Sequence, residues 1–119
     1  MVRSICLNLV LLATAAAMHT ANASAFFGWQ VARVAAGDVL MVRAFPDPAS
    51  RILVGYPSGT PLSLTGRCTG GLDLNTINGL SASAQASAVR DRWCQVWVDP
   101  YASGNWQSGW VSGRYIRPL

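Results

Sequence analysis

The five tryptophans are the residues of this chain whose type and spacing are best suited to contacting a ligand. Trp93 and Trp97 alternate with Cys94, Val96 and Val98, and successive side chains of a β-strand point to opposite faces. The spacing predicts a strand whose cysteine and valines face a core while both indoles face outward. Aromatic faces suit sugar rings, prolines and peptide backbones, and the indole N–H adds a hydrogen-bond donor.

The composition argues against catalysis. The single histidine, His19, lies near the amino terminus, and the chain contains no lysine and no glutamate. Ser-His-Asp and Cys-His nucleophile systems therefore cannot form in the rest of the chain. We expect no catalytic residue, no metal site, since too few thiolates are present for zinc, and no cofactor. The aspartates fit turn and cap positions: Asp38, Asp47, Asp73, Asp91 and Asp99.

Residues 1–25 have the features of a secretory signal peptide. Arg3 precedes an apolar stretch over 5–18, and small residues at 23–25 form a cleavage site. We predict cleavage after Ala25, with Ala23 as second choice, and a periplasmic or secreted protein without membrane attachment. The alternative is an uncleaved amino-terminal anchor.

Cleavage would remove Cys6 and leave Cys68 and Cys94 in an oxidising compartment, which predicts a disulfide between them. Residues 26–119 then form one domain, which we expect to be monomeric. Every basic residue is an arginine, and the arginines are scattered rather than clustered in a run. This distribution does not indicate a nucleic-acid-binding protein.

Short apolar runs separated by Gly, Pro, Asp and Ser predict a small all-β barrel or sandwich. The predicted strands cover residues 29–36, 39–45, 51–56, 60–66, 93–99 and 108–116. An insertion over residues 69–92 interrupts this pattern. Within it, 81–92 has apolar residues at helical spacing and predicts a short helix capped by Ser81 or Ser83, the alternative being a flexible Ala/Ser loop.

Two stretches together resemble the bacterial SH3 (SH3b) domain family. "GDVLMVRAFPDPASRILVGYPSGTPLSLTG" is similar to its opening half and "WCQVWVDPYASGNWQSGWVSGRYI" to its closing half. Met41 departs from the Asn common in the family, and the 69–92 insertion falls between the third and fourth strands. The resemblance implies an SH3-like barrel of five to six strands and a non-catalytic module that binds peptidoglycan or peptides. It also implies that Trp93 and Tyr115 flank the ligand groove.

Five aromatic residues are therefore candidates for ligand binding: Trp93, Tyr115, Trp106, Trp110 and Trp97. Some indoles could instead be structural: Trp110 beside Tyr115, Trp29 at the opening of the barrel, and Trp97 under a cover formed by Leu72, Leu74, Ile77 and Leu80. Arg43 and Arg114 could reach a ligand carboxylate or remain solvated. The first functional hypothesis is recognition of cell-wall peptide or glycan. The second is an interaction or inhibitor domain that binds another exported protein through these aromatics or the insertion.

Overall fold

The computed structural model describes residues 26–119, and the predicted signal peptide lies outside the described residues. The strands are β1 (Phe26–Val31), β2 (Leu40–Arg43), β3 (Ile52–Tyr56), β4 (Pro61–Cys68), β5 (Leu72–Asp73), β6 (Trp93–Val98), β7 (Gln107–Ser112) and β8 (Ile116–Pro118). Helix α2 (Ala82–Val89) and the 3-10 turns η1 (Leu74–Thr76) and η2 (Gly113–Tyr115) complete the described elements.

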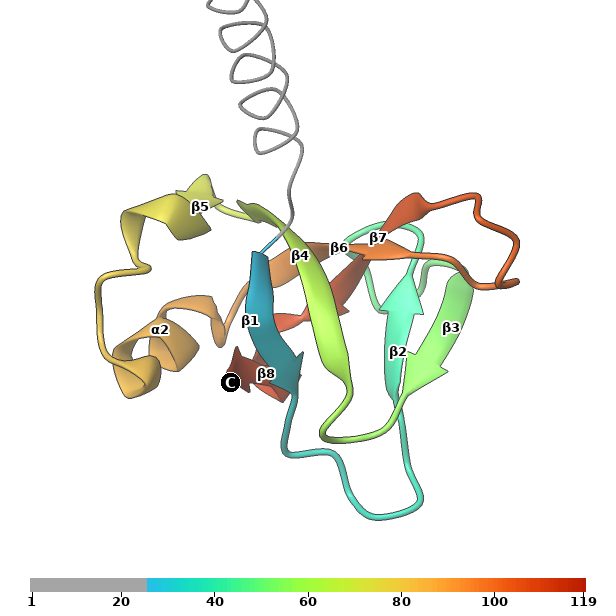
Figure 1. The fold of residues 1–119 in the computed structure, drawn as a ribbon, viewed down its shortest axis with the longest axis horizontal. Coiled ribbons are helices and arrows are strands. Elements are labelled where there is room, and N and C mark those ends of the chain that lie inside the picture. Colours follow the sequence, from blue (N-terminus) through green and yellow to red (C-terminus); the bar gives the residue numbers. More distant parts are fainter. Residues whose placement is uncertain (1–25) are drawn as a thin grey trace, which may run out of the picture.

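All strands belong to one antiparallel sheet in the order β3-β2-β7-β6-β4-β1-β8, with β5 paired to β4 (Figure 1). The predicted all-β class with an SH3-like barrel architecture is confirmed. The six predicted strands have counterparts, and the short strands β5 and β8 are added to them. The first strand was predicted to continue to residue 36, but it ends at Val31 because Arg33 adopts a left-handed φ of 62° that no strand accommodates.

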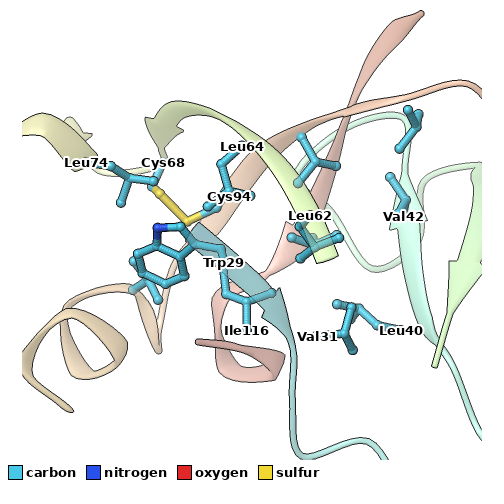
Figure 2. Close-up of a cluster of buried hydrophobic side chains, with 14 of the residues drawn as sticks. Trp29, Val31, Leu40, Val42, Leu62, Leu64, Cys68, Leu74, Cys94 and Ile116 are labelled. Carbon is cyan, nitrogen blue, oxygen red and sulfur yellow. A yellow bond between two sulfur atoms is a disulfide. The ribbon is translucent and has the colours of Figure 1, made fainter. Parts of the chain in front are cut away.

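Strand β6 follows the predicted alternation. Cys94, Val96 and Val98 are buried, whereas Trp93 is half-buried and Trp97 is exposed. The inward side chains join residues of β1, β2, β4 and β7 in one hydrophobic core (Figure 2). Trp29 is part of this core and lies facing the disulfide and Leu74, which places it deeper than the predicted position at the opening of the barrel.

The insertion folds into the same core as the barrel. The predicted helix is present, shorter than expected, and Ser81 accepts a hydrogen bond from the Ala84 backbone N–H at 3.2 Å. Leu74 is 1% exposed and Ile77 is 8% exposed, and both belong to the core cluster. They therefore do not cover Trp97, which is 43% exposed. Of the four residues in that alternative, Leu74 and Ile77 belong to the core, Leu72 packs against it and Leu80 is 50% exposed.

The predicted disulfide joins Cys68 of β4 to Cys94 of β6. The two residues are direct partners in the antiparallel pairing of these strands, and both are buried. The crosslink therefore closes the insertion at its base. A disulfide is typical of proteins that fold in oxidising compartments. Within residues 26–119, no helix has the length and apolar character needed to cross a membrane.

Reduction of this disulfide is expected to destabilise the fold substantially. The bond spans a sequence separation of 26 residues, and the loop-closure entropy of such a crosslink corresponds to about 3.5 kcal/mol. Denaturant unfolding with and without reductant measures this loss. The Cys68→Ala/Cys94→Ala double variant should unfold like the reduced protein and show no response to reductant. A wild-type protein whose unfolding is insensitive to reductant would contradict the prediction.

Candidate functional site

Trp93 and Tyr115 line the same surface hollow, which we call the aromatic groove and which has a volume of about 570 Å³. Trp93 opens β6, while Tyr115 ends η2, so the two rings come from segments more than twenty positions apart. The β1–β2 connection, β2 and the β2–β3 loop supply the other walls. These wall residues are Arg33, Val34, Ala35, Asp38, Val39, Leu40, Met41, Arg43 and Pro48, with Ser112 beside Tyr115.

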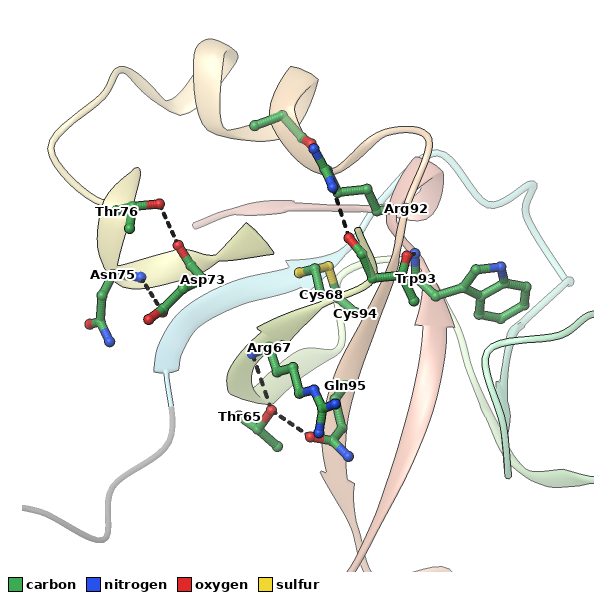
Figure 3. The surroundings of a disulfide bond; sticks show 12 residues. Thr65, Arg67, Cys68, Asp73, Asn75, Thr76, Arg92, Trp93, Cys94 and Gln95 are labelled. Atoms are coloured by element: carbon green, nitrogen blue, oxygen red, sulfur yellow. Dashed lines mark hydrogen bonds between the residues drawn. A yellow bond between two sulfur atoms is a disulfide. The ribbon is translucent and has the colours of Figure 1, made fainter. Parts of the chain in front are cut away.

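The base of the insertion holds Trp93 in place. The Trp93 backbone N–H donates to Thr69 Oγ1 at 2.9 Å, and its carbonyl accepts from the Thr69 N–H at 2.8 Å. Arg92 donates to the carbonyl oxygens of Thr69 at 2.8 Å and Ala88 at 3.1 Å. Figure 3 shows the Trp93 indole pointing away from the disulfide that its neighbour Cys94 forms. The insertion therefore fixes the backbone of Trp93 and leaves the indole in the groove.

Arg33 holds the segment that carries Tyr115. Its Nε donates to the Arg114 carbonyl at 3.0 Å and its terminal nitrogen to the Ile116 carbonyl at 3.2 Å. The neighbouring Ala32 N–H donates to the Tyr115 carbonyl at 2.8 Å. Arg33 reaches these acceptors from a left-handed backbone with φ of 62°, which costs a non-glycine residue roughly 1–2 kcal/mol. This strain is therefore offset by three hydrogen bonds that fix the position of Tyr115.

Helix α2 packs closely behind the same segment. Gly113, the first residue of η2, donates its N–H to the Arg92 carbonyl at 2.7 Å. A Cβ on Gly113 would overlap the Val89 carbonyl oxygen and lie 3.0 Å from the Arg92 carbonyl oxygen. Only glycine allows this approach, so the insertion helix and the Tyr115 segment are in direct backbone contact.

The groove combines aromatic and apolar walls with a positive charge balance. Arg33 and Arg43 line it, and Asp38 is the acidic residue among its lining residues. Arg43 donates to the Ser50 carbonyl at 3.0 Å, and Asp38 accepts from the Val39 N–H at 2.8 Å. Away from the groove, burial raises the pKa of Tyr56, and the negative charge of Asp99 adds to the increase. The groove thus presents two guanidinium groups and one carboxylate among aromatic and apolar walls.

The structure separates the other tryptophan candidates from the groove. Trp110 is half-buried and lines a second hollow, of about 510 Å³, with the Gly-containing turn between β4 and β5. Trp97 lies on the same face of β6 as Trp93 but does not line the groove. Trp106 is 61% exposed and ends the β6–β7 loop. Trp93 and Tyr115 are therefore the two aromatic candidates that the fold brings together. Arg43 joins them in the groove, and Arg114 does not line it.

The β6–β7 loop presents two aromatic residues in a fixed conformation. The Asp99 carboxylate accepts hydrogen bonds from the N–H groups of Ser103 at 3.0 Å and Gly104 at 2.8 Å. Tyr101 is 82% exposed in this loop and Trp106 follows it. The exposed aromatic surface at this end of the β6–β7 hairpin is separate from the aromatic groove.

Every aspartate has a local structural role. Four of them accept backbone hydrogen bonds in turns or caps: Asp38, Asp47, Asp73 and Asp99. The fifth, Asp91, forms an exposed ion pair with Arg114 at 3.6 Å. Among the described residues, no group of three or more His, Cys, Asp or Glu side chains is placed to hold a metal ion. The groove offers a binding surface and no pair of carboxylates.

Sequence reasoning missed most of the groove wall. Arg33, Asp38 and Pro48 line it. Arg33 falls inside the strand predicted over residues 29–36, whereas Asp38 and Pro48 fall in predicted turns. The Gly37-Asp38 and Pro46–Pro48 turn signals did locate the loops that form the wall. Nothing in the sequence indicates that Arg33 bends back to the Tyr115 segment. Comparison of the chain with protein-family models, curated proteins and solved structures finds no match.

Removal of the Arg33 side chain is expected to loosen Tyr115. Arg33→Ala loses two hydrogen bonds and should lower the free energy of unfolding by about 1–2 kcal/mol. Arg33→Gly loses the same side chain but relieves the left-handed backbone, so it should be more stable than Arg33→Ala by about 1 kcal/mol. Denaturant unfolding measures stability, and NMR relaxation of Tyr115 measures mobility. An unchanged Tyr115 in both variants would refute the clamping role.

The contact between Gly113 and the insertion helix predicts a position-specific effect of alanine. Gly113→Ala forces a methyl group against backbone carbonyls and should destabilise the protein by at least about 1–3 kcal/mol. Gly79 is the matched control, because nothing lies within 4 Å of a Cβ built there. Gly79→Ala should leave the unfolding midpoint nearly unchanged. Equal effects of the two substitutions in thermal unfolding would show that α2 does not pack as described.

Proposed function

We propose that this chain is an exported, non-catalytic SH3b-like module, periplasmic or secreted, that binds cell-wall peptide or glycan in the aromatic groove. The observation that carries the proposal is that Trp93 and Tyr115 line one groove. These are the two residues that the family resemblance assigned to a ligand groove. The resemblance came from the order of short motifs, whereas the groove comes from the packing of distant segments, so the two arguments are separate.

The construction of the groove supports binding rather than chemistry. Hydrogen bonds fix the backbones on which both rings stand. A ligand then meets rings that are already in position, which lowers the entropy lost on binding. Arg33 and Arg43 supply donors for carboxylates, which wall peptides carry. A single lining carboxylate, Asp38, is not enough for a two-carboxylate glycosidase mechanism.

A second candidate function is favoured by the exposed aromatics of the β6–β7 hairpin. Trp97, Tyr101 and Trp106 expose large apolar surface outside the groove. Aromatic residues are enriched at protein interfaces and often dominate their binding energy. An interaction or inhibitor domain acting on another exported protein would use this surface. The insertion is a poorer interface than the sequence suggested, because Leu74 and Ile77 are buried in the core.

Co-sedimentation with purified sacculi tests the first candidate, using chain purified after export. The wild-type protein should co-sediment, and Trp93→Ala should lose about 30-fold in affinity, the effect of a binding residue worth about 2 kcal/mol. Trp97→Ala is the matched control, because it removes an indole from the same face of the same strand outside the groove.

The outcomes separate the two candidates. Retained binding in Trp97→Ala together with loss in Trp93→Ala supports wall recognition through the groove. Absence of sedimentation by the folded wild-type protein would overturn wall recognition. If sedimentation is lost in Trp97→Ala and kept in Trp93→Ala, the ligand binds the β6–β7 surface instead. Circular dichroism of each variant confirms that the fold is intact.

A further inference from the structure

A third hollow, of about 380 Å³, lies between helix α2 and strands β1 and β8 and is lined by three arginines: Arg33, Arg90 and Arg117. We call it the arginine hollow. Its other lining residues contribute no acidic side chain. The remaining walls are Gln30, Ala82, Ser83, Ala86, Pro118 and Leu119.

The fold brings these arginines together from three elements. Arg117 lies on β8 directly opposite Gln30 of β1 in the antiparallel pairing. Arg90 follows the last residue of α2, which packs against β8. Ala82 and Ala86 lie one turn apart on the helix face that lines the hollow, and their short side chains leave room between helix and sheet.

No aspartate side chain of residues 26–119 forms an ion pair with the arginines of the hollow. The one ion pair of this part of the chain joins Arg114 to Asp91 at 3.6 Å. Arg33 donates to backbone carbonyls, and the guanidinium groups of Arg90 and Arg117 donate no hydrogen bond to the described residues. A concave surface lined by charges of one sign concentrates its field and attracts ions of the opposite sign.

The chemistry of these side chains defines what fits. A guanidinium presents paired N–H donors in a planar fork that matches the two oxygens of a carboxylate or phosphate. Arg90 and Arg117 have their full sets of donors available within the described residues, and Ser83 adds a hydroxyl. Arg33 lines both this hollow and the aromatic groove, so the two hollows adjoin at one residue.

We propose that the arginine hollow binds an oxyanion, a carboxylate or phosphate group, through Arg90 and Arg117. The anion is either free in solution or an acidic group of the ligand that occupies the aromatic groove, since Arg33 lines both hollows. The site itself does not depend on the proposed wall recognition. Two arms of one experiment distinguish the two sources of the anion.

The first arm titrates the exported chain with inorganic phosphate at constant ionic strength and follows the arginine Nε–Hε signals by NMR. Saturable shifts are expected at Arg90 and Arg117. The double variant Arg90→Gln/Arg117→Gln should lose at least tenfold in phosphate affinity. The matched control is Arg51→Gln/Arg67→Gln, which removes two charges from exposed positions outside the hollow and should bind phosphate like the wild type.

The second arm repeats the comparison with soluble wall fragments that carry free carboxylates. If Arg90→Gln/Arg117→Gln weakens fragment binding tenfold, the anionic group belongs to the groove ligand. If phosphate affinity falls and fragment binding is unchanged or absent, the site takes a free anion. Both results support an oxyanion site in the arginine hollow. The second result would show that this site exists even if the proposed wall recognition fails. Equal shifts at Arg51 and Arg67, or equal loss of phosphate affinity in the control variant, would overturn it.

Discussion

The direct pairing of Cys68 with Cys94 is the constraint on which the rest of the structure depends. It joins adjacent strands β4 and β6 at the point where the insertion leaves and re-enters the barrel. Because both cysteines are buried, the insertion begins and ends inside the core. Leu74 and Trp29 pack on the same cluster, so barrel, insertion and first strand share one hydrophobic interior (Figure 2). A small domain buries a small fraction of its surface, so its stability depends on every segment contributing side chains to the one core.

The aromatic groove is a consequence of that arrangement. Trp93 immediately precedes the crosslinked Cys94, and Thr69 immediately follows Cys68, so the crosslink brings together the residues that hold the indole. Tyr115 is held from the opposite side by Arg33, through backbone carbonyls alone. Two sets of hydrogen bonds thus fix the backbone positions from which both rings project.

The sequence predicted the parts of the structure that depend on local patterns. Alternation in β6 identified its buried face, and the cysteine count identified the crosslink. Helical spacing and a serine cap identified α2. The errors concern packing between distant segments. Leu74 and Ile77 are apolar enough to cover Trp97, but they are buried in the core. Which surface they contact depends on where the insertion packs, and no local pattern specifies that.

The candidate site likewise has parts that local patterns predict and parts that depend on packing between distant segments. Trp93 and Tyr115 could be chosen because short motifs around them resemble a family, but Trp110 and Trp97 looked equivalent by residue type alone. The register of β6 and β7 places Trp93, Trp97 and Trp110 on one face of this strand pair. Their positions along it separate them, since only Trp93 lines the aromatic groove and Trp110 lines the second hollow. The left-handed backbone of Arg33 was not predictable, because arginine rarely adopts it and the hydrogen bonds that offset its cost join residues about eighty positions apart.

The pairing of β1 with β8 places the first and last described strands side by side. A chain that emerges amino-terminus first, from a ribosome or through a membrane pore, leaves one edge of β1 open until residues 116–118 arrive. The sheet therefore cannot be completed stepwise during emergence, and the final closure is a long-range event, which slows folding. Until then β1 exposes a row of backbone groups that another chain could pair with. The protein is therefore most prone to aggregate in the interval before β8 pairs with β1.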